Sequence, residues 1–205
     1  MTTAVAERRT QAERRAASRA KLLDAALESL AELGYTGASL PEVVRRAGLS
    51  NGGLWRHFRS KAELMAAASL EAEERLLAAS RAAVVEGRSV QERLDTALTQ
   101  LFSWVEQPAM VAIFELLLAS RADAELRAAM QASDERAGAL FHEEIARLLG
   151  PDLAAHPRFE ANVRELGLLL YGIAVTHHLR PREARRALQQ ELHDLAFRLF
   201  DVLQS

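Results

Sequence analysis

The sequence has no cysteine among its 205 residues, which excludes disulfides, iron–sulfur clusters and thiolate zinc sites. It also has no run near the roughly 18 consecutive apolar residues that a membrane helix needs, and no apolar signal core follows the N-terminal arginines. These absences favour a cytoplasmic protein without a membrane partner. Proline and glycine are scarce, with 5 and 10 residues, and most lie at plausible helix breaks. Because Ala, Leu, Glu and Arg dominate, the composition predicts an all-α fold.

The net charge of −2 hides an uneven distribution along the chain. Residues 1–61 hold 11 Lys or Arg and 6 Asp or Glu, an excess of five positive charges. Residues 62–205 hold 15 and 22, an excess of seven negative charges. A basic first third on an acidic body indicates an anionic partner for the first third. Nucleic acid and an anionic membrane surface both fit, unless the asymmetry arose by chance.

Helix starts are marked by four pairs of residues with the spacing of a capping box, in which a hydroxyl and a carboxylate cap each other's backbone N–H groups. The pairs are Thr10 with Glu13, Ser39 with Glu42, Ser60 with Glu63, and Ser89 with Glu92. Apolar residues between these starts recur with a helical period. The sequence therefore predicts about nine helices, near residues 10–34, 39–47, 51–58, 60–85, 89–105, 108–120, 123–149, 157–179 and from 182 towards the C-terminus.

Two of these helices, 39–47 and 51–58, are short and are joined by a three-residue turn that contains Gly48. This is a helix-turn-helix pattern. In this motif the second helix enters the major groove of DNA and the first crosses the backbone. The pattern alone fits an ordinary corner of a helical bundle equally well.

A longer series of residues resembles the DNA-binding domain of the tetracycline-repressor (TetR) family over residues 15–65. Its upstream part fits the first helix of that domain and consists of Arg19, Leu22, Leu23, Ala25 and Ala26. Its main part follows at fixed spacing and consists of Gly34, Tyr35, Ser39, Leu40, Ala47, Gly48, Leu49, Ser50, Gly52, Leu54, Trp55, His57, Phe58, Ser60, Lys61, Ala62, Glu63 and Leu64.

The resemblance implies an N-terminal three-helix helix-turn-helix DNA-binding domain at 1–61 and a C-terminal helical bundle at 62–205 for ligand binding and dimerisation. It also implies a ligand-responsive transcriptional regulator. The expected form is a repressor that binds a palindromic double-stranded DNA operator as a homodimer and is released by a small, mostly apolar effector. An activator stays open, as does a helical ligand-binding or enzymatic protein of this fold that does not bind DNA.

The resemblance implies that Asn51, Gly53 and Arg56 contact the DNA bases. Arg suits guanine and Asn suits adenine in the major groove. Gly53 departs from the family, where a hydroxyl residue is common, and weakens the helix by roughly 1 kcal/mol against Ala. It either lets the backbone approach DNA closely or leaves a flexible helix that orders on binding. Arg45 and Arg46 are expected to add steering charge.

Phosphate contacts fall on Ser39, Trp55, His57 and Lys61. A hydroxyl at a helix N-cap can reach a phosphate, and the helix end adds partial positive charge, although plain capping and a solvated lysine are the alternatives for Ser39 and Lys61. Trp55 stands where the family usually has Tyr, and its alternative is core packing beside Leu54. A basic tail upstream either reaches an adjacent minor groove or is solvated, and it consists of Arg8, Arg9, Arg14 and Arg15.

The last two helices carry more apolar surface than one core face requires. Residues 166–175 include no charged side chain, which predicts a helix buried all round. Packing of both helices against those of a second chain about a two-fold axis accounts for this surface, and a monomer with a central helix 157–179 is the alternative. The predicted interface residues are Leu166, Gly167, Leu170, Leu188, Leu192, Leu195 and Leu199.

A ligand pocket is expected inside the bundle, lined by apolar residues and a few polar ones. The polar tips of Trp104, Tyr171 and His178 need partners if they are buried, which makes these three the better candidates. The full set of candidates is Phe102, Trp104, Met110, Phe114, Leu118, Met130, Phe141, Tyr171, Val175 and His178.

The sequence contains no motif of an enzyme, and we expect neither a cofactor nor a metal. The segment from His142 to Glu144 lacks the second His of a zinc-protease helix. No phosphate loop, Rossmann fingerprint or nucleophile elbow is present. A metal site built from His142, His156 and His178 is the remaining alternative.

Overall fold

The computed structural model describes residues 10–81 and 87–202, and within these ranges it contains α-helices and one 3-10 helix but no strand. The all-α prediction is therefore confirmed. The helices are α1 (Gln11–Gly37), α2 (Leu40–Ala47), α3 (Asn51–Trp55), α4 (Lys61–Ser80), α5 (Val90–Val105), α6 (Pro108–Ala119), α7 (Ala124–Ala154), α8 (Phe159–Thr176) and α9 (Arg182–Leu199), with the 3-10 helix η1 (His177–Leu179) between the last two.

The helices begin where the capping residues predict. Thr10 caps α1 in a reciprocal box, since its hydroxyl accepts from the Glu13 N–H at 3.2 Å and its own N–H donates to the Glu13 carboxylate at 2.7 Å. The same reciprocal box opens α5 at Ser89. Ser39 also caps α2, but only the hydroxyl half of the box is present, because the Glu42 carboxylate accepts from arginines instead.

Four helix ends differ from the sequence prediction. The first helix α1 continues past Gly34, whose φ is +65°, and ends at Gly37. The recognition helix α3 stops at Trp55 rather than near residue 58, so Arg56 forms its C-cap. The helix α7 does not end in a loop at Gly150, because the chain resumes helical geometry from Pro151 after a single residue with φ of +83°. At the other end of the bundle, α8 tightens into η1 after Thr176. The predicted end of α4 near residue 85 lies outside the described residues, as do Arg8 and Arg9.

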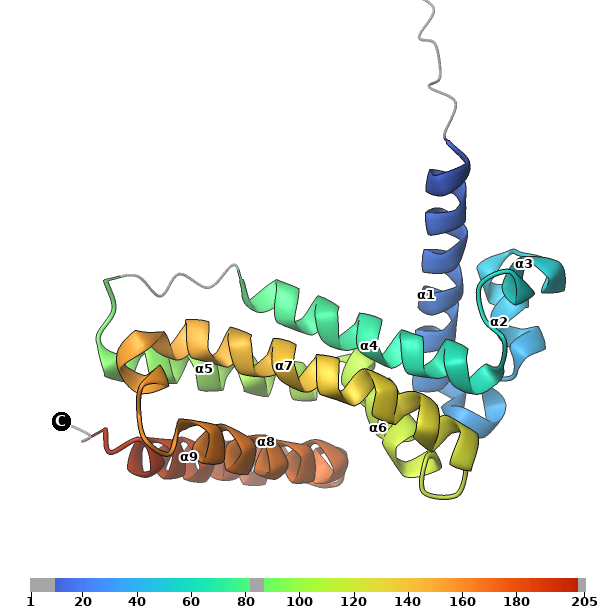
Figure 1. Ribbon diagram of the computed structural model, residues 1–205. Helices are drawn as coiled ribbons and strands as arrows, with labels where there is room; N and C mark the ends of the chain where they lie inside the picture. The colour runs from blue at the N-terminus through green and yellow to red at the C-terminus, as the bar shows by residue number, and fades with distance from the viewer. Residues whose placement is uncertain (1–9, 82–86, 203–205) are drawn as a thin grey trace, which may run out of the picture.

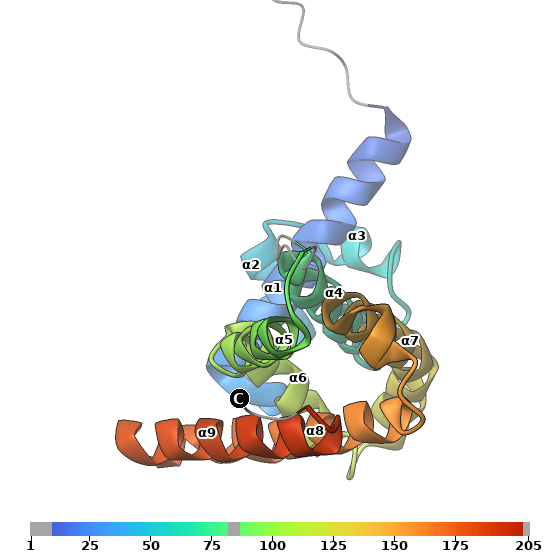
Figure 2. The same ribbon diagram turned by 90° about the vertical axis from the view of Figure 1, so that its left-hand side faces the viewer.

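The helices form a head, which consists of α1, α2 and α3, and a layered body (Figures 1 and 2). In the head, α1 stands across the long body helices, and α2 and α3 pack beside it (Figure 1). In the body, α4, α5 and α7 run above a layer made by α8 and α9, which lies on the opposite side of the molecule from α3 (Figure 2). The helix α6 lies where the head meets the body.

Two apolar clusters hold these parts together, and α4 belongs to both. Its first two turns contribute Leu64 and Met65, both fully buried, to the cluster of the head. Its last turns contribute Leu76 and Leu77 to the cluster of the body. The helix α6 is shared in the same way, because Leu116 lies in the head cluster. The predicted division at residue 61 therefore falls at the start of a helix that spans both clusters.

The outer layer corrects the prediction that helix 157–179 is buried all round. Leu166, Leu170 and Leu192 are each 6% exposed and pack in the chain's own core rather than on its outside. The outer face of α8 is instead uncovered in the single chain. Its exposed apolar side chains are Leu168, Leu169 and Val175, and η1 adds Leu179, whereas Tyr171 is exposed towards a cavity that Leu168 also borders. The other interface candidates on α9, Leu188, Leu195 and Leu199, are partly exposed.

A buried polar side chain joins the two helices of this layer, α8 and α9. Asn162 on α8 is fully buried, and its Nδ2 donates to the carbonyl of Leu199 at 2.5 Å. This bond fixes the N-terminal part of α8 against the end of α9. The two helices therefore present one continuous outer surface.

We expect Gly150→Ala to lower the free energy of unfolding by about 1–2 kcal/mol, because a left-handed conformation puts the new Cβ against the following carbonyl. The added Cβ would also lie 2.9 Å from Nε of Arg93, which donates to the carbonyl of Leu149. Gly138→Ala on the same helix is the matched control. Its Cβ would meet nothing within 4 Å, so it should stabilise by about 0.5–1 kcal/mol. Urea unfolding followed by circular dichroism measures both, and equal effects would contradict the role of Gly150.

Candidate nucleic-acid interface and ligand cavity

The helix-turn-helix is held by a small buried set and presents the rest of α3 to solvent. Leu54 and Phe58 are 1% and 3% exposed and pack in the head cluster. Asn51 and Arg56 are exposed, and Trp55 is 53% exposed. Core packing is therefore excluded for Trp55, and the three side chains share the free surface of the recognition helix.

Gly53 is not required by the packing of the head. A Cβ built there would lie 3.6 Å from Oγ of Ser50 and 3.8 Å from Cβ of Leu49, which are ordinary contacts. Its φ is not in the left-handed region, unlike that of Gly48, whose φ of +63° closes α2. The fold therefore accepts a larger residue at position 53, and the glycine leaves backbone at the surface of the helix.

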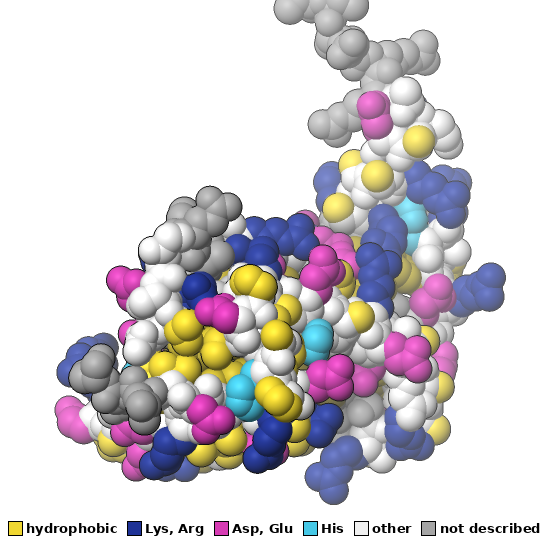
Figure 3. All heavy atoms as spheres, turned by 60° about the vertical axis from the view of Figure 1, so that its left-hand side comes forward, with side chains coloured by type: hydrophobic (Ala, Val, Ile, Leu, Met, Phe, Trp, Pro, Cys, Tyr) yellow, Lys and Arg dark blue, Asp and Glu magenta, His cyan; other side chains and the backbone are white. Residues whose placement is uncertain are grey.

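Three of the four predicted phosphate residues, Ser39, His57 and Lys61, already have partners within the protein. Ser39 caps α2 by accepting from the N–H of Glu42 at 3.4 Å. Nε2 of His57 lies 2.7 Å from Oγ of Ser18 on α1, and the ring is partly buried. Burial and the nearby Arg15, Arg19 and Arg56 together lower the pKa of His57 below its usual value. Arginines on α1 and α3 therefore create a positive potential at this surface, and Figure 3 shows Lys and Arg side chains gathered around α1.

Lys61 occupies a position that sequence reasoning did not foresee. Its Nζ donates to the carbonyl of Tyr35 at 2.6 Å and lies 4.1 Å from the centre of the Tyr35 ring. The Tyr35 hydroxyl in turn donates to Asp123, the N-cap residue of α7, at 2.7 Å. Burial lowers the pKa of Lys61, and Asp123 counteracts this. One of the three N–H donors of the ammonium is thus used to join the head to α7, and two remain for a phosphate.

Two arginines of α2 also differ from the sequence prediction of steering charge. Arg46 binds Glu32 on α1 at 2.7 Å and Glu42 at 2.6 Å. Arg45 donates to the same Glu42 carboxylate through two nitrogens, at 2.9 and 2.6 Å. These bonds lower the pKa of Glu42 to about 2. The charge of both arginines is therefore largely neutralised by the protein, and Arg56 and Arg59 remain as exposed cations near α3.

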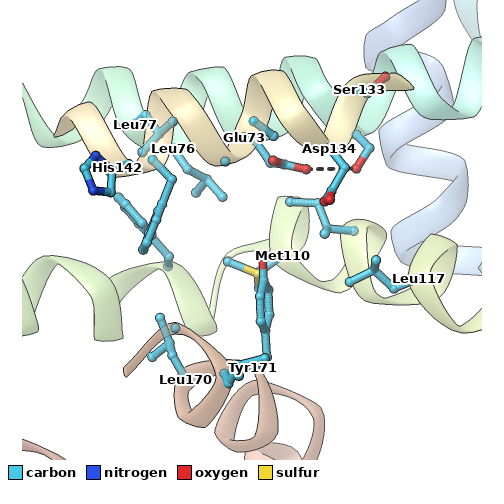
Figure 4. Close-up of a pocket in the computed structure, with 18 of the residues that line it drawn as sticks. Glu73, Leu76, Leu77, Met110, Leu117, Ser133, Asp134, His142, Leu170 and Tyr171 are labelled. Atoms are coloured by element: carbon cyan, nitrogen blue, oxygen red, sulfur yellow. Dashed lines mark hydrogen bonds between the residues drawn. The ribbon is translucent and has the colours of Figure 1, made fainter. Parts of the chain in front are cut away.

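A cavity of about 430 Å³ lies within the body, between α4, α6, α7 and α8 (Figure 4). Most of its lining is apolar. Five of the predicted pocket residues line it, namely Trp104, Met110, Met130, Phe141 and Tyr171. Gly167 and Leu170, which were predicted at the dimer interface, also line it.

The other five predicted pocket residues are not in the cavity lining. Leu118 and Val175 are 53% and 41% exposed and project outward, and His178 is exposed beyond the end of α8. Phe102 packs on the body cluster, and Phe114 packs edge-on against the Tyr171 ring at 5.5 Å. The period of an α-helix shows which residues share a face but does not show which face turns inward. The sequence therefore could not separate the residues that line this cavity from those that do not.

The cavity contains polar residues that sequence reasoning missed. Glu73 on α4 and Asp134 on α7 lie on the same side of the cavity, with Met110 and Tyr171 across from them (Figure 4). Oγ of Ser69 donates to Glu73 at 3.2 Å, the contact drawn in Figure 4. Burial, reinforced by Asp134 and Glu74, raises the pKa of Glu73 to about 7. On a helical wheel Glu73 resembles the neighbouring surface glutamates, so only the packing distinguishes it.

The structure does not bring the histidines of the alternative metal site together. His142 lines the cavity and packs edge-on against Phe159 at 5.1 Å. His156 lies 3.3 Å from Asp201, and His178 is exposed. Among the described residues, no group of three His, Asp or Glu side chains has an arrangement that could hold a metal ion.

Within the described ranges no single helix is long and apolar enough to cross a membrane. The bent pair formed by α5 and α6 meets the length and composition criterion only when both helices are taken together, with an angle of 70° between them.

A short helix pair with an exposed second helix, joined to a helical body, is the arrangement found in helix-turn-helix proteins. Residues 22–68 match the model of the family described as bacterial regulatory proteins, tetR family. The uncharacterized HTH-type transcriptional regulator Rv2912c of Mycobacterium tuberculosis is 30% identical over 174 residues, which cover 85% of this chain and 89% of that protein. The chain therefore belongs to the TetR family of transcriptional regulators.

Further relatives agree with this assignment. The HTH-type transcriptional regulator CymR of Pseudomonas putida is 32% identical over 130 residues, which cover 63% of this chain and 64% of that protein. The crystal structure of a transcriptional regulator from a Rhodococcus species superposes with a TM-score of 0.70 at 22% identity, over 91% of this chain and 100% of that chain. The latter similarity shows a shared fold. The family is one of regulators that bind DNA, not of enzymes.

We expect Glu73→Gln to stabilise the protein at pH 8 and to have little effect at pH 5. The raised pKa means that the folded protein holds a proton that the unfolded chain releases between pH 4.5 and about 7, so this carboxyl lowers stability as the pH rises through that range. The variant should gain about 1–3 kcal/mol at pH 8.

Urea unfolding of both proteins at pH 5, 6, 7 and 8 measures this difference. Glu143→Gln, on the exposed side of α7, is the control and should change little at any of these values. A gain from Glu73→Gln that does not depend on pH would contradict a buried, protonated carboxyl.

Proposed function

We propose that the protein is a homodimeric repressor that binds a palindromic operator and is released when a small, mostly apolar effector occupies the cavity. It acts in the cytoplasm, where its DNA target lies. The observation that carries this proposal is that the cavity and the head share the same two helices. A ligand in the cavity therefore contacts the elements that position α3.

The shared helices give the coupling a physical route. On α6, Ile113 and Leu117 line the cavity, whereas Leu116 packs in the head cluster and Glu115 accepts from the N–H of Tyr35 at 3.4 Å. On α4, Ala66 and Ser69 line the cavity two turns from Lys61. A shift of either helix on ligand binding moves the contacts of Tyr35, and with them the head. Effector binding lowers DNA affinity only as far as the effector prefers the shifted state, typically about 5–150-fold.

The surface of α3 supports a role in DNA binding. Asn51 and Arg56 present an amide and a guanidinium, which suit adenine and guanine edges in the major groove. Trp55 offers an exposed indole N–H to a phosphate, and Ser39 and Lys61 offer further donors at the N-termini of α2 and α4. Gly53 lets the backbone of α3 approach the DNA closely, since a side chain is not needed there for packing.

The uncovered face of α8 supports dimerisation. Leu168 and Leu179 are 65% and 75% exposed, and contiguous apolar surface of this kind is rare on a monomer. A second copy that packs α8 and α9 about a two-fold axis covers this face. The face lies away from α3 (Figure 2), so two heads remain free to reach two half-sites.

We expect Arg56→Ala to relax base preference at one position in each half-site, with a loss of about 1–3 kcal/mol on the preferred sequence, since a bidentate contact to guanine is removed. Lys61→Ala should weaken binding to all sequences and reduce the salt slope by about 1 per contact. Gel shifts on the DNA upstream of the protein's own gene, at several salt concentrations, separate these effects.

Arg121→Ala, an exposed arginine on the loop between α6 and α7, is the control and should bind like the wild type. If Arg56→Ala and Lys61→Ala also bind like the wild type, the DNA surface assigned to α2–α4 is wrong. A reporter gene downstream of the same DNA distinguishes a repressor from an activator by the sign of the change when the protein is removed.

We expect Leu169→Glu combined with Leu179→Glu to convert the dimer to a monomer, because two carboxylates would lose their hydration in an apolar interface. Light scattering after gel filtration gives the mass. Leu33→Glu is the matched control, since Leu33 is an equally exposed leucine on α1, 46% exposed, and this variant should remain dimeric. A wild-type protein that is monomeric at micromolar concentration would refute the proposed interface.

A further inference from the structure

The charges on the cavity wall are mainly negative. Among its charged lining residues, Glu73, Asp134 and Glu160 are acidic and Arg164 is basic. Glu73 and Asp134 come from facing helices and lie on one side of the cavity (Figure 4). Both carboxylates also act on the hydroxyl of Tyr171. Burial is the main cause that raises the pKa of Tyr171 to about 12, and the charges of Glu73 and Asp134 contribute to the same increase. The two carboxylates and the Tyr171 hydroxyl therefore form one polar end of an otherwise apolar space.

A second observation points to a ligand at the opposite end. Trp104 lines the cavity and is only 4% exposed, and its Nε1 has no hydrogen-bond partner among the described residues. Nε2 of His142, at the far end of the cavity from Asp134 (Figure 4), is likewise buried without a partner in the described part of the chain. Buried polar atoms in native proteins are usually hydrogen-bonded. Two residues of the cavity wall, Trp104 and His142, therefore carry polar atoms that are unsatisfied within the described part of the chain.

A buried carboxylate without a cation beside it is costly, and a bound cation removes that cost. Glu73 accepts from the Ser69 hydroxyl, which is a neutral donor. Glu74, the next acidic residue on α4, has its own cation, because Arg136 donates to it at 2.8 Å. Within the described part of the chain, no Lys or Arg forms an ion pair with Glu73, which faces the cavity. An anionic ligand would be repelled from this end.

We propose that the effector is a lipophilic cation, with an apolar body in the cavity and an ammonium-type group between Glu73 and Asp134. This inference rests on the proposed function and specifies the chemical class of its ligand. The Tyr171 ring at the same end provides a π-face for the cation. A cavity of about 430 Å³ lies in the range of sites that hold small organic ligands.

Titration calorimetry with three matched probes tests the charge preference on the full-length protein. The probes are octyltrimethylammonium, octanol and octanoate, which share an alkyl chain and differ in charge. We expect octyltrimethylammonium to bind at one site per chain, with the other two at least about tenfold weaker, because the Coulombic attraction to the carboxylates is absent for octanol and reversed for octanoate. Equal binding of octanol and the cation, or no binding of the cation, overturns the proposal.

Substitutions test whether Glu73 is responsible for the preference of the cavity for a cation. Glu73→Gln should weaken octyltrimethylammonium about tenfold and leave octanol unchanged, whereas Glu143→Gln should behave as the wild type. Asp134→Asn should weaken the cation in the same direction. If Glu73→Gln binds the cation as well as the wild type does, the carboxylate is not part of the site.

The pH dependence gives an independent readout. A cation needs the charged form of Glu73, whose pKa is about 7 in the unliganded protein, so affinity should rise from pH 6 to pH 8 and binding at pH 7 should release protons. The other titratable or charged groups around the cavity are Asp134, His142, Glu160, Arg164 and Tyr171, with Glu74 next to Glu73 on α4. Glu73→Gln removes the contribution of Glu73 to the pH dependence of cation affinity. If this variant keeps the pH profile of the wild type, the result counts against the proposal.

Gel shifts on the same samples separate this inference from the proposed function. Operator release by octyltrimethylammonium supports both. Tight cation binding without operator release leaves the charge preference of the cavity standing and refutes the effector role. Operator release by octanol without preferential cation binding retains the effector role and refutes the cationic ligand.

Discussion

The structure depends on one constraint, which is that α4 is packed along its whole length by two different clusters. Its first turns complete the core of the head, and its last turns form the wall of the body. Lys61 at its start is fixed to the carbonyl of Tyr35, whose hydroxyl binds the N-cap of α7. These contacts couple the head to the body. The position of the recognition helix is set by the same helix that borders the cavity.

Local features of the fold were readable from the sequence, and long-range features were not. The caps at Thr10 and Ser89 follow from residues three positions apart, so the helix starts were predicted within a residue. The hydrogen bond from Lys61 to Tyr35 joins residues 26 apart, and no spacing pattern in the sequence predicts such a contact. The resemblance to the TetR family suggested a DNA surface because the proposed surface lies on short helices with many matched positions.

The cavity shows the same limit. Aromatic and Met residues such as Trp104 and Met110 were found by composition, because large apolar side chains gather in any core. Glu73 was missed, since a glutamate on an amphipathic helix normally faces water. A segment without charges, such as that of α8, does not show which face its own chain covers. Leu166 is buried and Leu168, within the same turn, is exposed, and only the three-dimensional structure distinguishes them.

The two tryptophans have opposite surroundings, with Trp55 exposed on α3 and Trp104 enclosed beside the cavity. They are the only two in the sequence. The emission of the exposed indole is quenched by an added solute such as iodide and that of the enclosed indole is not. The chain thus carries one intrinsic fluorophore at each of its two proposed binding surfaces. Occupancy of the DNA face and of the cavity can be followed separately in one unlabelled sample, with each single Trp→Phe variant isolating the other signal.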